Sequence, residues 1–152
     1  MAKPAEIKLL AATDGDVLQK VAEGVFDDPL DPTAAAEFLA DDRHHLAVAI
    51  ADGLVVGFIS AVHYVHPDKP APELWINEVG VAPTHQRQGV ARKMMETVLA
   101  EARRLGCSGA WVLTERANTA AMHLYAQCGG SEAPQDTVMF EFDLTGEHNT
   151  TK

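Results

Sequence analysis

The stretch that decides the fold is ELWINEVGVAP, residues 73–83, which is followed directly by THQRQGVA, residues 84–91. Its apolar and β-prone residues predict a strand over residues 73–82. Asn77 and Glu78 interrupt this apolar pattern, and Gly80 indicates a bulge or a close approach of backbone. A bulge would splay the strand and leave backbone N–H and C=O groups free for a ligand.

The acid in this strand has two interpretations. A buried, unpaired carboxylate costs several kcal/mol, so it is not expected without compensation. Glu78 is therefore either part of a hydrogen-bonded structural pair with Asn77 at a sheet edge, or a functional acid that faces a cleft. The strand pattern by itself leaves both interpretations open.

The segment after the strand predicts an anion site. Residues 85–91 precede a predicted helix, whose N-terminus offers unpaired N–H groups and the positive end of the helix dipole. Phosphates bind readily at such positions. Gly89 and Ala91 would let a bulky anion approach the backbone, and Arg87 could add a charged contact. An ordinary loop-to-helix junction would show the same Gln-x-x-Gly-x-Ala pattern.

The periodicity of the apolar residues predicts the remaining elements. Further strands are expected over residues 6–11, 45–51, 54–64, 110–114 and 137–144, and helices over 13–25, 32–39, 88–105 and 118–128. Asp52 and Gly53 predict a tight hairpin turn, and Gly106 ends the longest helix. This order predicts an α/β fold with a mixed sheet and helices on both faces. We expect one domain over residues 1–152, with a frayed tail over 145–152.

The last predicted helix carries two residues of interest. Ala121, Leu124, Tyr125 and Cys128 share one helical face. Tyr125 is either a core aromatic residue or a functional phenol, and Asn118 is either an N-cap or a ligand contact. The helical pattern does not decide between these roles.

Charge narrows the class of partner. The net charge is −10, which argues against nucleic acid because phosphate binding needs a basic surface. An acidic surface suits cationic ligands instead. Residues 14–42 hold nine acids against one base, Lys20, so this segment is either a solvated face or a site for cations.

Other functional classes are not expected. No apolar run approaches the roughly 20 residues that span a bilayer, and the N-terminus has no apolar region of a secretory signal. Cys107 and Cys128 are expected to be reduced thiols of a cytoplasmic protein. We expect no metal, because His44, His45, His63 and His66 have no further ligands at zinc-like spacing.

Three motifs together resemble the GNAT superfamily of N-acetyltransferases. They are EVGVAP at residues 78–83, then Gln86-x-x-Gly89-x-Ala91, then Asn118-x-x-Ala121-x-x-Leu124-Tyr125-x-x-x-Gly129. They match in order and spacing, and the resemblance covers residues 54–144. It implies a GNAT fold that splays between the strands at 74–81 and 110–114, with acetyl-CoA in the cleft.

The resemblance also implies roles for single residues. Tyr125 would lie near the thioester sulfur and protonate the leaving thiolate. The cofactor-binding residues would be Val79, Gly80, Val81, Gln86, Arg87, Gln88, Gly89, Val90, Ala91, Asn118 and Ala121.

Within the superfamily, the chain looks most like the aminoglycoside 3-N-acetyltransferases. The supporting stretches are VFDDPL at residues 25–30, the strand at 73–83 and WVLTE at 111–115. Glu78 would be the general base, because an amine must lose its proton before it attacks. The expected substrate-binding residues are Asp27, Asp28, Asp31, Asn77 and Glu115.

Several alternatives stay open. The acceptor is either an aminoglycoside or another amine, such as a polyamine or a peptide N-terminus. A non-catalytic acyl-CoA-binding module and a homodimer also remain open. A covalent cysteine route is disfavoured, because Cys128 has no evident base beside it although His123 is near in sequence.

Overall fold

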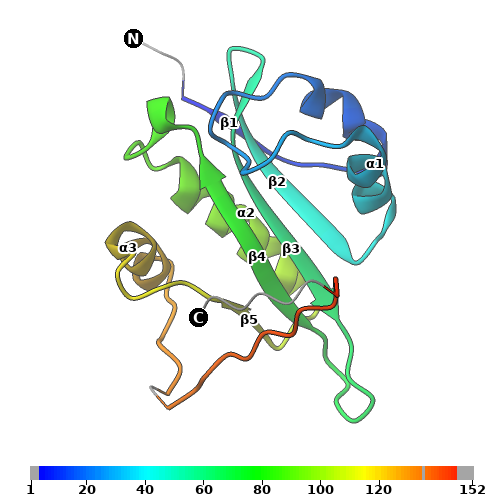
Figure 1. Cartoon of the computed structure of the whole chain (residues 1–152), viewed down its shortest axis with the longest axis vertical. Coiled ribbons are helices and arrows are strands. Elements are labelled where there is room, and N and C mark those ends of the chain that lie inside the picture. Colours follow the sequence, from blue (N-terminus) through cyan, green and yellow to red (C-terminus); the bar gives the residue numbers. More distant parts are fainter. Residues whose placement is uncertain (1–3, 135, 147–152) are drawn as a thin grey trace.

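The computed structural model describes residues 4–134 and 136–146, and it contains one five-stranded mixed sheet in the order β1-β2-β3-β4-β5 (Figure 1). The first four strands pair antiparallel, whereas β5 pairs parallel with β4. This confirms the predicted mixed α/β class. The strands are β1 (Glu6–Leu9), β2 (His44–Ala51), β3 (Leu54–Tyr64), β4 (Glu73–Val81) and β5 (Gly109–Val112).

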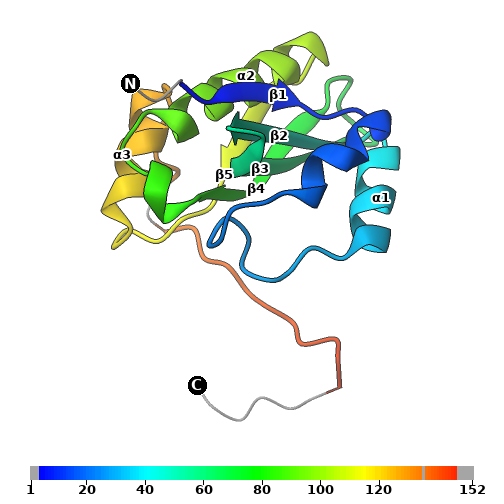
Figure 2. The ribbon, with the colours of Figure 1, turned by 90° about the horizontal axis from the view of Figure 1, so that it is seen from above.

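Helices lie on both sides of the sheet. The helix α2 packs along one face, where its buried residues meet those of the strands (Figure 2). The opposite face is covered by α1 and by the loop before it. The helices are the 3₁₀ helices η1 (Ala12–Gln19) and η2 (Pro83–His85) and the α-helices α1 (Pro32–Ala40), α2 (Val90–Arg104) and α3 (Thr119–Gln127). No helix within the described ranges is both long and apolar enough to cross a membrane.

The central hairpin forms as its sequence predicts. Asp52 and Gly53 both have positive φ, 51° and 75°, which is the backbone that a two-residue hairpin turn requires. The turn sets β2 against β3, and the fully buried Ile59, Leu74 and Met94 lie where the sheet meets α2. The core is therefore centred between β3, β4 and α2.

The first predicted helix is wrong over its second half. The helix η1 ends at Gln19, and the chain is not helical over 20–25. The backbone of this segment pairs with β3 instead: Val55 donates to the Lys20 carbonyl at 2.9 Å, and Ala22 donates to the Val55 carbonyl at 2.8 Å. A tertiary backbone contact thus overrides the helical spacing of the valines.

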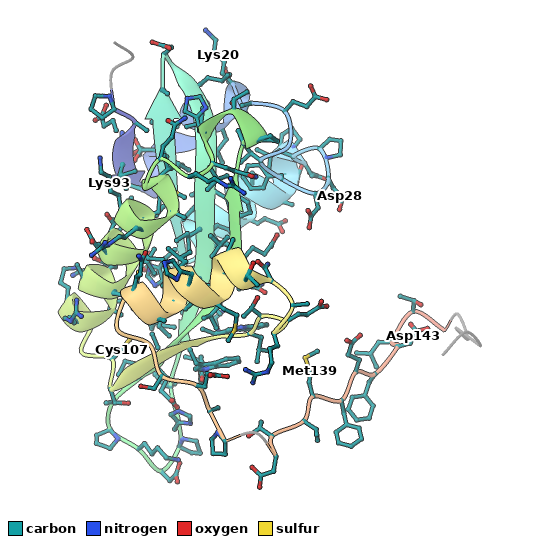
Figure 3. The ribbon with its side chains drawn as sticks, turned by 90° about the vertical axis from the view of Figure 1, so that its left-hand side faces the viewer. Lys20, Asp28, Lys93, Cys107, Met139 and Asp143 are labelled. Atoms are coloured by element: carbon teal, nitrogen blue, oxygen red, sulfur yellow. The ribbon has the colours of Figure 1, made fainter. Side chains whose placement is uncertain are left out.

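The last predicted strand is also wrong. Residues 137–144 form no strand in the described structure, and the segment leads away from the sheet (Figures 2 and 3). Its apolar side chains are 65–92% exposed. The alternating pattern is present, but the segment has no neighbouring strand to pair with. Of the predicted tail over 145–152, residues 147–152 lie outside the described residues.

The pairing of β3 with β4 contains the predicted bulge. Ser60 lies opposite Glu78 and Ala61 lies opposite Ile76, so Asn77 is an extra residue in β4. Three positions after Asn77, a Cβ at Gly80 would lie 2.4 Å from the Val25 carbonyl oxygen and 2.7 Å from the Phe58 ring. Gly80 therefore permits the loop after η1 to touch β4.

This contact predicts that Gly80→Ala destabilises the fold. The added methyl group would overlap backbone and an aromatic ring, so we expect a loss of about 1–3 kcal/mol in the free energy of unfolding. Urea unfolding followed by circular dichroism measures it. The matched control is Gly15→Ala, where the methyl group meets nothing within 4 Å. Equal stability of both variants would show that the loop is not held against β4.

Candidate active site

The bulge in β4 gathers polar side chains on one face of the sheet. In a regular strand Trp75 and Asn77 would share one face, and Glu78 would lie on the other. Because Asn77 is an extra residue, Asn77 and Glu78 both line the same cavity as Trp75. The cavity has a volume of about 500 Å³. Phe58 and Ser60 of β3 also line this cavity.

Aromatic side chains form the walls of this cavity. Phe26 stacks on Phe58, with ring centroids 4.0 Å apart. Trp75 stacks on Trp111 of β5 at 5.2 Å with an angle of 10° between the ring planes, and the Trp111 indole N–H donates to the Tyr64 hydroxyl at 2.6 Å. The site therefore offers flat apolar surfaces beside its carboxylates, which suit a ring-shaped or cationic ligand.

The acidic loop before α1 borders the cavity. Asp27 and Asp28 line it, and they also line a second cavity of about 800 Å³, with which it shares several lining residues. Asp31 lines the first cavity too, but its carboxylate caps α1 by accepting from the Thr33 and Ala34 N–H groups at 2.9 and 3.1 Å. Glu115 lines neither cavity. The structure thus brings Asp27 and Asp28 to the cavity as free acids.

Glu78 is exposed, so the apolar strand does not bury an unpaired carboxylate. Within residues 4–134 and 136–146, neither Asn77 nor Glu78 has a side-chain hydrogen bond or ion pair, so the structural Asn–Glu pair is not formed. The cavity rather than the protein interior receives this charge. Glu78 is consequently free to take a proton from a group in the cavity.

The sheet splays where the resemblance implied. The pairing of β4 with β5 ends at Ile76 and Val112, whereas β4 continues to Val81 with β3 as its sole partner strand in the described structure. The outer backbone edge of β4 over residues 77–81 is therefore unpaired. It faces the side of the sheet on which α3 lies (Figure 1).

The N-terminus of α2 follows this free edge. Gly89 is its N-cap with a φ of 77°, and no side chain caps the helix. The loop before it is held by Gln86 and Gln88, whose side-chain amides donate to the Val81 and Thr84 carbonyls, both at 3.2 Å. Arg87 also has a positive φ, 63°. Open N–H groups on a rigid, glycine-containing turn fit a phosphate.

The helix α3 presents Asn118 and Tyr125. Asn118 acts as its N-cap, because its side-chain oxygen accepts from the Ala121 N–H at 3.0 Å. Tyr125 is half-buried, and burial, with a smaller effect of Cys128, raises the pKa of its phenol. The phenol therefore keeps its proton through neutral pH. Neither cavity is lined by α3.

The cysteines do not form a nucleophilic site. Cys107 and Cys128 are free thiols, and burial raises the pKa of both, so neither is activated as a thiolate. Among the described residues, no group of three or more His, Cys, Asp and Glu side chains could hold a metal ion.

A comparison with known families decides the family. The sequence model "Acetyltransferase (GNAT) family" matches residues 16–130, which include β2 to β5, the splay and the N-terminus of α2. The chain belongs to this family. Streptothricin acetyltransferase of Streptomyces lavendulae is 32% identical over 110 residues, which cover 72% of this chain and 56% of that protein. This GNAT chain thus spans little more than half the length of that curated relative.

Solved structures share the fold. An aminoglycoside acetyltransferase, meta-AAC0020 from an uncultured soil metagenomic sample in complex with trehalose, superposes with a TM-score of 0.79 at 19% identity, over 92% of this chain and 96% of that one. AAC(6')-Iy, in complex with a bisubstrate analogue of CoA and acetylneamine, gives a TM-score of 0.74 at 21% identity, over 93% and 99% of the two chains. At these identities the likeness shows the GNAT fold.

The sequence missed part of this site. Trp75 lies inside the deciding stretch, but its partner Trp111 could be assigned only from the β4–β5 register. Ser60 likewise carries no motif, and its place beside Glu78 follows from the β3–β4 pairing.

The geometry of α2 predicts that Gly89→Glu weakens CoA binding. The new side chain would carry a negative charge to the N–H groups and would strain a residue with positive φ, so we expect at least a tenfold increase in Kd, which is about 1.4 kcal/mol. Isothermal titration calorimetry with CoA measures it. The matched control is Gly106→Glu, which has a φ of 78° and equally open space but lies beyond the other end of α2. Equal CoA affinity in both variants would exclude this helix end.

Proposed function

We propose that this GNAT protein transfers the acetyl group of acetyl-CoA to an amine of a cationic small molecule. The observation that carries the proposal is the free carboxylate of Glu78, which opens into a cavity bordered by Asp27, Asp28 and aromatic rings. Carboxylates attract an ammonium group, and aromatic faces hold the apolar body of such a ligand. The position of Glu78 at the bulge, beside the unpaired edge of β4, supports transfer of the acetyl group rather than binding of the cofactor alone.

The residues present fit acetyl-CoA, which supplies the acetyl group as a thioester. The N–H groups of residues 86–91 would hold its pyrophosphate, and Arg87 would add a charged contact. The free edge of β4 over Val79, Gly80 and Val81 would pair with the pantetheine arm. Asn118 and Ala121 of α3 would border the pantetheine arm. The side-chain oxygen of Asn118 caps the helix, so its amide N–H₂ group remains available to the cofactor.

The chemistry follows from these places. Glu78 would accept a proton from the ammonium group of the acceptor, directly or through water, so that the amine nitrogen can attack the thioester carbonyl carbon. The backbone N–H near Val79 would polarise that carbonyl. As the carbon–sulfur bond breaks, Tyr125 would give its proton to the thiolate, and the second proton that the attacking nitrogen loses would restore the phenol. The raised pKa of Tyr125 supports its being protonated beforehand.

For the acceptor we propose an aminoglycoside, acetylated at the 3-N position and thereby inactivated as an antibiotic in the cytoplasm. The support is the acidic, aromatic cavity, the sequence likeness at residues 25–30, 73–83 and 111–115, and relatives that act on cationic antibiotics. Streptothricin is a second candidate, because the streptothricin acetyltransferase is 32% identical to this chain.

The deciding experiment measures release of free CoA thiol from acetyl-CoA with a panel of amines. The panel contains aminoglycosides with and without a 3-amino group, streptothricin, a polyamine and a peptide N-terminus. We expect turnover with 3-amino aminoglycosides, and mass spectrometry of the product locates the acetyl group. Turnover with another amine alone would replace the acceptor, and CoA binding without turnover on any amine would identify a non-catalytic acyl-CoA-binding module.

Replacing the general base predicts a loss confined to the chemical step. Glu78→Gln keeps the size of the side chain but cannot accept the proton, so we expect kcat to fall by about 10²-fold or more with CoA affinity unchanged. Steady-state kinetics and calorimetry measure the two values. The matched control is Glu6→Gln, an exposed acid of β1 outside both cavities. A normal kcat in Glu78→Gln would assign Glu78 no part in catalysis.

The acidic loop predicts that binding of a polycationic acceptor depends on salt. Asp27→Asn and Asp28→Asn should each raise KM for the aminoglycoside several-fold, because each removes a charge-assisted hydrogen bond while CoA affinity stays unchanged. The wild-type KM should also rise between low and high salt, since exposed charges are screened. Asp42→Asn, an exposed acid that lines neither cavity, is the control. Equal KM values in all variants would place the acceptor elsewhere.

A further inference from the structure

The proposed function does not explain the buried hydroxyl group of Ser60. It is 8% exposed, and its hydroxyl oxygen is the one buried side-chain polar atom in the described ranges without a hydrogen-bond partner. Buried hydroxyl groups are nearly always paired, because an unpaired one disfavours folding. An alanine would fit the strand without this penalty, so the serine calls for another reason.

The position of Ser60 supplies that reason. It lies directly opposite Glu78 in the β3–β4 ladder, beside the bulge, and both residues line the same cavity. Side chains in such a cross-strand pair lie within reach of one another, with Cβ atoms about 5 Å apart. The Glu78 carboxylate is exposed and has no other partner in the described structure, so it can turn toward Ser60.

We propose that Ser60 is a positioning residue for the acetyl transfer: its hydroxyl donates a hydrogen bond to the Glu78 carboxylate when an acceptor fills the cavity. One carboxylate oxygen is then fixed on Ser60, and the other is aimed at the acceptor nitrogen. A general base must be held within hydrogen-bond reach of its proton, which an unrestrained surface carboxylate is not. This inference rests on the proposed function.

The test compares Ser60→Ala with Ser60→Thr, which keeps the hydroxyl. Ser60→Ala should lower kcat about tenfold, with KM for the acceptor and CoA affinity nearly unchanged, while its Tm stays the same or rises because a buried unpaired group has been removed. Ser60→Thr should retain most of the turnover. Ser108→Ala, an exposed serine outside both cavities, is the control.

The outcomes separate the two proposals. Wild-type turnover on at least one amine of the panel supports the proposed function independently of any variant. Wild-type kcat in Ser60→Ala, or a loss of kcat that follows a loss of Tm, would overturn the role of Ser60 alone. Absence of turnover by the wild type would overturn the proposed function and the role of Ser60 with it.

Discussion

The single extra residue in β4 is the constraint on which the site depends. Because Asn77 is not matched in β3, Glu78 comes to the face of the sheet that carries Trp75 and Ser60. Without the bulge, regular alternation would place Asn77 and Glu78 on opposite faces. The acid would then point toward α2, and the acceptor cavity would lose it. The bulge also coincides with the point where β5 stops pairing, so acid and open edge occur together.

Local signals in the sequence were sufficient for most elements of the fold. The Asp52–Gly53 turn, Gly106 and the spacing of apolar residues fixed the hairpin and α2 to within about two residues. Both errors arose where an element needs a partner that local sequence does not name. Lys20 and Ala22, which lie in a predicted helix, pair with Val55 instead, and residues 137–144 alternate like a strand but have no strand beside them in the described structure.

The candidate site also combines residues that local sequence identifies with residues that only strand pairing brings to the site. Glu78 and Gly89 stand out in sequence, Glu78 as a charge in an apolar strand and Gly89 as a residue without a side chain where an anion could approach a predicted helix start. Ser60 and Trp111 break no local rule, and their proximity to the site exists only through strand register. Asp31 is the opposite case: its acidic neighbours suggested a ligand contact, but Asp31 is used by the cap of α1, while Asp27 and Asp28 remain open to the cavity.

The unsatisfied polar groups of the chain gather around β4. The larger cavity of about 800 Å³ is lined by η1, α1 and the loop between them, and neither Ser60 nor Glu78 lines it. In the described structure, the free strand edge belongs to β4, the uncapped N-terminus to α2, which follows β4, and the buried hydroxyl without a partner to β3, which pairs with β4. Folding alone does not reward such an arrangement, because each group forgoes a hydrogen bond that a different sequence would make. A ligand with phosphates, amides and a reactive carbonyl would pair with these groups, and its binding would stabilise the folded chain.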